Sequence, residues 1–212
     1  MAPVKIGIVG AGMIGGTLGR LWLRAGHQVR FGTRHPETLQ GVIEEEPTLA
    51  SAGSAEDAAA FGDVVLLAVP LAAVPGLGPS IAPFVAGKVV LDASNPYPDR
   101  DGAVATEATE HPGGCSAWVA SHLAGAHVVK AFNTVYFRTL EEQAHRPGDG
   151  LGITLAGDDP EALATAAALV RDAGFAPVMV GALDEGRRVE PGTPTYNTGM
   201  SASELALALG VA

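Results

Sequence analysis

The chain has 212 residues, of which 47% are hydrophobic, and its formal net charge at pH 7 is −10. This apolar content predicts a substantial buried core and excludes a disordered chain. The acidic balance argues against general nucleic-acid binding, which needs a basic surface. Cys115 is the only cysteine, and no apolar run reaches the roughly 18 residues of a spanning helix. We therefore expect a soluble, cytoplasmic protein without an intrachain disulfide, a nucleic-acid partner or a membrane partner.

The first 31 residues have the pattern of a dinucleotide-binding βαβ unit. Residues 4–9 form an apolar run typical of a buried strand, residues 14–25 place apolar side chains at helical spacing, and residues 27–31 are a second apolar segment. Between the first strand and the helix stands Gly-Ala-Gly-Met-Ile-Gly. The first glycine permits a tight turn, the second lets the backbone approach a pyrophosphate, and the third lets helix and strand pack closely. The residues that we predict to bind the dinucleotide phosphates are Gly10, Gly12, Met13, Ile14 and Gly15.

The residues after the second strand indicate which dinucleotide binds. An NAD enzyme typically has Asp or Glu there, which accepts hydrogen bonds from the ribose 2′-hydroxyl. Here the segment contains Thr33, Arg34 and His35, and the first carboxylate is Glu37. A guanidinium binds phosphate through charge-assisted hydrogen bonds, and Thr33 and His35 add further donors. We therefore predict NADP as the cofactor.

The rest of the chain continues to alternate between strands and helices. Strands are expected over residues 63–70, 88–93, 126–132, 152–156 and 176–180. Helices are expected over residues 36–46, from Ser54 with Asp57 as its capping-box partner, near residues 71–82 and 115–124, after Asp159, and over residues 201–209. This alternation predicts an α/β fold of the Rossmann type, with a doubly wound, mostly parallel sheet and helices on both faces.

The predicted organisation is an NADP-binding domain over residues 1–181 and a small C-terminal extension, residues 182–212, packed on it. Three stretches read as irregular, namely residues 94–114, 144–150 and 185–199. The first leaves the carboxyl end of a central strand, the edge where open α/β sheets bind ligands. It is either a substrate lid or a mobile surface loop.

No metal site is predicted. His111 and Cys115 are separated by Pro-Gly-Gly, so they do not share a helical face, and no further ligands follow at zinc spacing. The adjacent Asp158 and Asp159 precede a proline and read as a helix cap. No G-x-S-x-G elbow is present, so hydrolysis is the poorer interpretation.

Polar residues at two predicted strand ends are the candidates for chemistry. Asn95 follows one strand, and Asn133 and Thr134 follow the next. Their side chains suit a nicotinamide carboxamide or a carbonyl on the hydride acceptor. Asparagine is also an ordinary turn residue, but its presence at neighbouring strand ends favours a site.

Several motifs resemble the NADP-dependent coenzyme F420 oxidoreductase family. They are residues 5–18, 25–27 and 32–34, Asn95-Pro96-Tyr97, Lys130-Ala131-Phe132-Asn133-Thr134, and residues 157–159 and 174–178. The resemblance covers nearly the whole chain and implies hydride transfer between NADPH and the deazaflavin F420, face to face in a cleft. It also implies that Thr33 and Arg34 hold the 2′-phosphate and that Val69 and Pro70 pass beside the nucleotide. Asn95 and Ala131 complete the predicted nucleotide-binding set.

The C-terminal segment departs from the family pattern. Residues 187–194 and the short last helix differ from the longer apolar end of the archaeal F420 enzymes, which supplies part of their F420 pocket. The hydride acceptor therefore stays open between F420 and a similar flat redox partner. If F420 binds, its anionic tail needs a cationic rim, for which Lys130, Arg138, Arg187 and Arg188 are the candidates.

Two alternatives remain at this stage. Reduction of a small carbonyl or imine would need a proton donor such as Tyr97, Lys130 or Tyr196. The related imine reductases carry a large helical second domain, which about 30 residues cannot supply. A sensor that binds NADP without turnover is the third hypothesis. The expected partner is a small-molecule redox substrate, and a homodimer is the candidate assembly.

Overall fold

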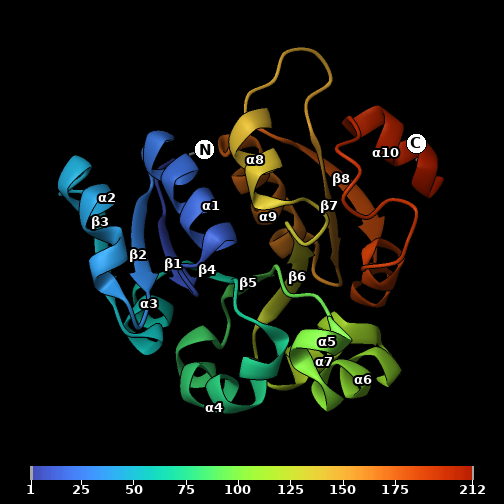
Figure 1. The fold of residues 1–212 in the computed structure, drawn as a ribbon, viewed down its shortest axis with the longest axis horizontal. Coiled ribbons are helices and arrows are strands. Elements are labelled where there is room, and N and C mark those ends of the chain that lie inside the picture. The colour runs from blue at the N-terminus through green and yellow to red at the C-terminus, as the bar shows by residue number, and fades with distance from the viewer. Residues whose placement is uncertain (1, 212) are drawn as a thin grey trace.

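The computed structural model describes residues 2–211, which form an α/β fold around one eight-stranded sheet (Figure 1). The strands are β1 (Lys5–Val9), β2 (Gln28–Gly32), β3 (Ala50–Gly53), β4 (Val64–Leu67), β5 (Val89–Asp92), β6 (His127–Ala131), β7 (Gly152–Gly157) and β8 (Ala176–Gly181). Their order is β3-β2-β1-β4-β5-β6-β7-β8. Only the β6–β7 pair is antiparallel among these strands. The predicted Rossmann-type, mostly parallel sheet is confirmed.

Helices cover both faces of the sheet. One face packs against α1 (Met13–Arg24), α2 (Gln40–Glu45), α8 (Phe137–Gln143) and α9 (Pro160–Asp172). The other packs against α3 (Ala55–Phe61), α4 (Val74–Val85), α6 (Ala103–Glu110) and α7 (Gly114–Ser121). The remaining elements are α5 (Pro98–Asp101), α10 (Ala202–Leu209) and the 3-10 helices η1 (Pro36–Leu39), η2 (Leu71–Ala73) and η3 (Leu183–Val189). Each face therefore has its own apolar core.

Local sequence signals explain several helix starts. Ser54 and Ser201 each form a capping box, with Asp57 and Glu204 as the respective partners. Asp159 accepts hydrogen bonds from two backbone N–H groups of the first turn of α9, and Pro160 occupies the first helical position. The predicted caps at Ser54 and Asp159 are confirmed.

Two parts of the sequence prediction were wrong. Residues 94–114 are not an irregular loop, since α5 and α6 lie within them, and residues 185–199 begin inside η3. Strand β3 was not predicted, because its four residues, Ala-Ser-Ala-Gly, lack the alternating or branched pattern that marks a strand. It lies at the edge of the sheet, where hydrogen bonding with β2 holds these residues in a strand without such side chains.

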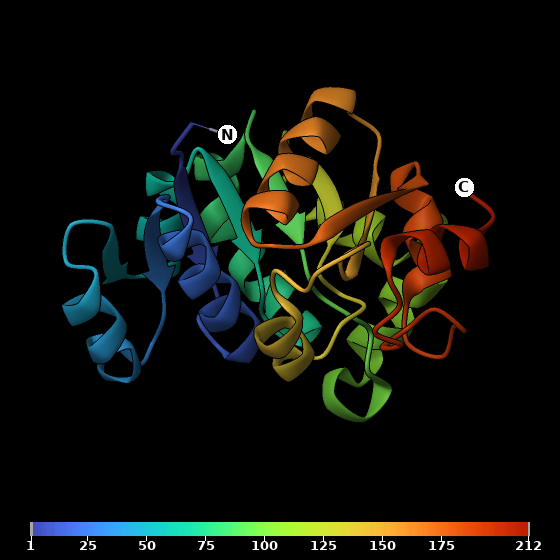
Figure 2. The ribbon, with the colours of Figure 1, turned by 90° about the horizontal axis from the view of Figure 1, so that it is seen from above.

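The C-terminal segment packs on β7 and β8 through a small apolar cluster of its own. Val178 and Val180 on β8 meet Val189 of η3 and Leu205 and Leu209 of α10. Figure 2 shows this segment at the end of the molecule opposite β3 and α2. The division into a domain of residues 1–181 and an extension of residues 182–212 stays a prediction. Within residues 2–211, no helix combines the length and apolar character that a membrane span requires.

The sheet contains a topological switch point beside β1. The chain runs outward from β1 through β2 to β3, and then returns to place β4 on the other side of β1. Open α/β sheets bind ligands in the crevice outside the strand carboxyl ends at such a point. The glycine-rich loop after β1 therefore lies where the topology places a ligand.

Candidate functional site

The glycine-rich loop joins β1 to α1 with little room for side chains. Gly10 has φ +99°, a conformation that favours glycine, and its N–H donates to the Gly32 carbonyl at 3.1 Å. A Cβ on Gly15 would overlap the Gly10 carbonyl oxygen and the Ile8 side chain. A Cβ on Gly12, by contrast, would meet no atom within 4 Å. Gly10 and Gly15 thus build the turn, while Gly12 borders open space.

That open space lies at the N-terminus of α1. Gly12 is the N-cap residue and provides no side-chain hydrogen bond to the first turn, which also contains no acidic residue. The backbone N–H groups there are available to an anion and carry the positive end of the helix dipole. The open face of Gly12 and these N–H groups fit the pyrophosphate of a dinucleotide.

The residues after β2 are placed as a ribose-phosphate site requires. Thr33 is partly buried, and its hydroxyl accepts a hydrogen bond from the His35 N–H at 3.0 Å. Arg34 is exposed and makes no intramolecular hydrogen bond or ion pair within residues 2–211. The exposed His35 ring lies 3.2 Å from the carboxylate of Glu37. The Arg34 guanidinium would therefore be available to form hydrogen bonds with a 2′-phosphate.

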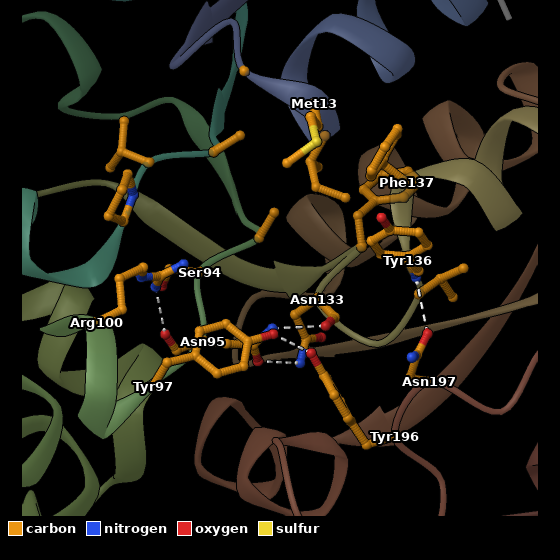
Figure 3. Close-up of a pocket in the computed structure, with 18 residues that line it drawn as sticks. Met13, Ser94, Asn95, Tyr97, Arg100, Asn133, Tyr136, Phe137, Tyr196 and Asn197 are labelled. Atoms are coloured by element: carbon orange, nitrogen blue, oxygen red, sulfur yellow. Dashed lines mark hydrogen bonds between the residues drawn. The ribbon is translucent and has the colours of Figure 1, made fainter.

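A cavity of about 550 Å³ opens beside the loop, at the carboxyl ends of the central strands (Figure 3). Its lining comes from the loop (residues 12–14), the end of β4 (68–70), the segment after β5 (93–95, Tyr97 and Arg100), the segment after β6 (132, 133 and 135–137), and Tyr196 with Asn197. The predicted residues Gly12, Met13, Ile14, Val69, Pro70, Asn95 and Asn133 all lie in this lining. The structure thus brings the nucleotide loop and both asparagines to one cavity.

A smaller cavity of about 270 Å³ adjoins it and shares Gly12 and Met13 with it. The polar residues of this second cavity are Thr17, Arg20, Thr38 and Glu141. Phe137 also lines both cavities, so they meet at the start of α1. The predicted 2′-phosphate residues Thr33, Arg34 and His35 line neither cavity.

Asn95 and Asn133 form the polar floor of the main cavity. The Asn95 amide donates to the Asn133 carbonyl at 2.8 Å, and the Asn133 amide donates to Asn95 Oδ1 at 3.2 Å and to the Val189 carbonyl at 2.9 Å. Asn133 Oδ1 is buried and accepts no hydrogen bond. A buried acceptor without a donor is costly, so this oxygen is suited to a ligand N–H, such as that of a carboxamide.

The backbone turns sharply just before Asn133. Phe132 has φ +61°, which is unusual for a bulky residue. Its ring is buried and makes edge contacts with Trp22 and Phe175, at centroid distances of 5.8 and 6.3 Å. Because packing fixes the ring, it also fixes the turn that directs Asn133 toward Asn95.

Not every predicted site residue reaches the cavity. Ala131 is fully buried in β6, and Thr134 is 2% exposed; neither lies in the cavity lining. The Thr134 hydroxyl has no hydrogen-bond partner within residues 2–211. Gly10 and Gly15 shape the loop without lining the cavity. As the cavity stands, Asn95 and Asn133 are in a position to touch a ligand and Thr134 is not.

The sequence suggested Lys130 as part of a cationic rim, but the structure buries its side chain in the interior. Its side chain is 1% exposed, and its ammonium lies 3.8 Å from Asp92 and 3.5 Å from Glu190. It also donates to the Ser116 hydroxyl at 3.0 Å. Burial alone would lower the pKa of Lys130, but the neighbouring carboxylates and Cys115 raise it above its ordinary value. The lysine is therefore a buried cation beneath the site.

The other rim candidates also lie elsewhere. Arg187 donates to the carbonyls of Asp184 and Pro112, and Arg188 bonds with Glu185 and the Leu209 carbonyl. Arg138 does not line the cavity either. Arg100, which the sequence did not single out, is the one cation in the lining. It was missed because its segment, now α5, read as an irregular loop.

Part of the cavity lining is an aromatic wall. Tyr97, Tyr136, Phe137 and Tyr196 contribute to it, and the hydroxyls of Tyr97 and Tyr196 are hydrogen-bonded to each other (Figure 3). The Tyr136 and Phe137 rings lie 4.6 Å apart between centroids. Tyr136 and Phe137 lie at the start of α8, and no local motif marked them as site residues. The cavity is thus suited to a flat ring system.

Neither metal nor thiol chemistry is indicated. Within residues 2–211, no group of His, Cys, Asp and Glu side chains could hold a metal ion. Cys115 is buried, and burial raises the pKa of its thiol to about 12. The thiol is therefore protonated near neutral pH and is a poor nucleophile.

Comparison with known proteins supports the nucleotide site. Residues 5–96 match the family described as NADP oxidoreductase, coenzyme F420-dependent. This confirms the family resemblance indicated by the sequence motifs. The chain is 31% identical over 187 residues to the metalloreductase STEAP3 of Rattus norvegicus, a match that covers 88% of this chain and 36% of that protein. The chain thus spans about a third of that relative's length.

Solved structures share the architecture over almost the whole chain. The hypothetical protein SMa0349 from Sinorhizobium meliloti is 28% identical, with a TM-score of 0.74, and the match covers 94% of this chain and 95% of that one. A provisionally named F420-dependent NADP-reductase from Arthrobacter sp. FB24 is 23% identical, with a TM-score of 0.73, and the match covers 93% and 99% of the two chains. These matches show that the fold, over nearly the whole chain, is found in other proteins.

We expect Lys130→Met to destabilise the protein by about 3–5 kcal/mol, because it leaves the buried carboxylates of Asp92 and Glu190 without their cation. Glu190→Gln in the same chain should recover part of the loss, since it removes one of those carboxylates. Lys5→Met, at an exposed position, is the matched control and should change stability little. Urea unfolding measures all three, and equal stabilities for the Lys130 and Lys5 variants would contradict the buried-cation interpretation.

Substitutions of the loop glycines Gly12 and Gly15 should have different effects on NADPH binding and on stability. Gly12→Val should abolish NADPH binding and leave the melting temperature unchanged, since the new side chain enters the space for the pyrophosphate. Gly15→Val should lower the stability by about 1–3 kcal/mol or more through overpacking. Gly41→Val, at an open helical position, serves as the control for both. Fluorescence titration and thermal melts separate these outcomes, and normal NADPH binding by the Gly12 variant would refute the phosphate site.

Proposed function

We propose that this chain, whose residues 5–96 match the coenzyme F420-dependent NADP oxidoreductase family, transfers a hydride between NADP(H) and a flat acceptor of the F420 type. The observation that carries the proposal is the shared cavity. The nucleotide loop forms one of its walls and four aromatic residues form another. Hydride transfer between flat rings depends on stacking and separation more than on a strong acid or base.

The chain's own residues divide the work of holding NADPH. The backbone at Gly12 and Met13 would bind the pyrophosphate, and Arg34 with Thr33 would bind the 2′-phosphate. Val69 and Pro70 lie in the lining between the loop and the aromatic wall, beside the path of the nucleotide. The unpartnered Asn133 Oδ1 would accept a hydrogen bond from the nicotinamide carboxamide. The nicotinamide supplies the hydride when bound.

The composition of the cavity favours a flat, largely uncharged acceptor head. Among its lining residues no carboxylate occurs, and the Arg100 cation is paired with Asp101 at 2.7 Å. Aromatic side chains prefer offset-stacked or edge contacts with another ring. A ring system such as a deazaflavin can therefore bind by contact with Tyr136 and Phe137, with its polar tail directed outward.

Reduction of a carbonyl or imine is the second candidate. The phenols of Tyr97 and Tyr196 line the cavity and offer the acidic proton that such a reaction needs. A sensor that binds NADP without turnover is the third. A homodimeric assembly, a cytoplasmic location, and the lack of nucleic-acid and membrane partners stay predictions from the sequence.

We expect NADPH to bind more tightly than NADH, because Arg34 faces no acidic residue that would repel a 2′-phosphate. Arg34→Ala should weaken NADPH binding by about 1.5–3 kcal/mol, the size of a lost charge-assisted hydrogen bond, and should leave NADH binding unchanged. Arg24→Ala, at the far end of α1, is the matched control. Calorimetric titration measures the affinities, and equal affinities of the wild type for the two cofactors would contradict the NADP assignment.

The acceptor is tested by absorbance. Purified protein with NADPH and oxidised F420 should consume both at equal rates, and NADP with reduced F420 should run in reverse. Turnover with carbonyls or imines but not F420 would select the second candidate. Tight NADPH binding without turnover on F420, flavins, quinones, carbonyls or imines would select the sensor.

A further inference from the structure

Tyr97 and Tyr196 meet at the cavity although 99 residues separate them. Tyr97 lies in the segment after β5, next to Asn95 and Pro96. Tyr196 lies in the segment after η3. Both side chains are partly buried and line the cavity, and their hydroxyls form a hydrogen bond (Figure 3). The pair thus brings two phenolic O–H groups of the aromatic wall into contact, whereas the third phenol of that wall, Tyr136, is exposed.

A cation is fixed over one member of the pair. The Arg100 guanidinium lies 4.7 Å from the centre of the Tyr97 ring. Asp101 holds it through hydrogen bonds of 3.0 Å to Nε and 2.7 Å to Nη2. The same buried carboxylate accepts from the Tyr97 N–H at 3.1 Å. One short segment therefore sets both the phenol and the cation above it; the cation favours a phenolate, and the paired Asp101 offsets part of that effect.

We propose that Tyr97 is a catalytic residue that donates a proton to the bound acceptor, while Tyr196 and Arg100 stabilise the phenolate that remains. This inference rests on the proposed function. The acceptor class is a flat molecule that takes a hydride on a ring carbon and a proton on a ring nitrogen or a carbonyl oxygen. It names a role for the tyrosines that hydride transfer alone does not require.

The step balances as follows. The acceptor gains two electrons with the hydride from NADPH, which leaves as NADP⁺, and a new C–H bond forms on the ring carbon. The O–H bond of Tyr97 breaks, and its proton forms a bond to the acceptor heteroatom. The Tyr97 phenolate then takes a proton from water.

The roles within the pair follow from their surroundings. Burial, together with the hydrogen bond to Tyr97, raises the pKa of Tyr196 well above its ordinary value, and the charge of Arg100 only partly opposes this. In the proposed step Tyr196 keeps its proton and would donate it in the hydrogen bond that the two hydroxyls share. Lys130 is not an alternative donor, because it is buried beneath the cavity between Asp92 and Glu190.

The pair can be tested without turnover, because the chain contains only 3 tyrosines. Alkaline titration of the apoprotein is followed by tyrosinate absorbance, and the hydrogen bond to Tyr97 should delay the ionisation step of Tyr196. Tyr97→Phe should move this step to lower pH, since the hydrogen bond to Tyr97 is lost. Tyr136→Phe, which removes the exposed tyrosine of the same wall, should leave the step in place. A Tyr196 step that ignores the loss of Tyr97 would overturn the pair.

The role in catalysis is tested with NADPH and oxidised F420 as the probe. Tyr97→Phe keeps the ring and should lower kcat by about 10²–10⁴-fold, the usual contribution of a general acid, with an unchanged Kd for NADPH. The fall of the wild-type rate at alkaline pH and its solvent isotope effect should also disappear. Tyr196→Phe should lower kcat less than Tyr97→Phe does.

The outcomes separate the inference from the function on which it rests. If the wild type reduces F420 and Tyr97→Phe does so within threefold, the proton donor is refuted and the proposed function stands. A variant that loses NADPH affinity in proportion to kcat would show a structural role and refute the inference equally. If the wild type binds NADPH but reduces no acceptor, the proposed function fails and this step fails with it.

Discussion

The buried ammonium of Lys130 ties together the parts of the chain that build the site. It reaches Asp92 at the end of β5, Ser116 in α7 and Glu190 after η3. An unpaired charge in the interior costs free energy, so the folded chain keeps these groups in contact. Burial raises the pKa of Glu190, which the cation only partly offsets. The ends of two central strands and the C-terminal segment are thereby fixed beneath the cavity.

The polar floor above this cluster depends on the same constraint. Asn133 follows the strand that carries Lys130, and its amide donates to the carbonyl of Val189, the residue before Glu190. The C-terminal segment is held a second time by Asn197, whose N–H donates to the Thr134 carbonyl and whose Oδ1 accepts from the Tyr136 N–H. Because Tyr196 lies between these anchors, its phenol reaches Tyr97. A segment far along the chain thus completes a site that begins at residue 10.

The sequence predicted the position and shape of the glycine-rich loop, but it did not predict which residues surround the rest of the cavity. The roles of Gly10, Gly12 and Gly15 follow from local backbone geometry, which a short motif records. The burial of Lys130 does not follow from local geometry, because its partners Asp92 and Glu190 are distant along the chain. From the sequence alone, a lysine near a strand end is expected to be exposed. The aromatic wall was missed for the same reason, since its members come from segments with no common pattern. Tyr97 and Tyr196 appeared only as candidate proton donors, without sign that they meet.

The charge distribution now changes the expectation for the acceptor. A rim of Arg187 and Arg188 would have drawn an anionic tail toward the cavity, but both arginines are bonded to other parts of the protein. The cation that does line the cavity, Arg100, is matched by the buried Asp101, and the chain as a whole carries a net charge of −10. Long-range attraction therefore contributes little to holding an anionic acceptor. Under the proposed function, affinity would come from the contact of flat rings with the aromatic wall, and discrimination would come from whether the acceptor presents a basic atom to the Tyr97 hydroxyl.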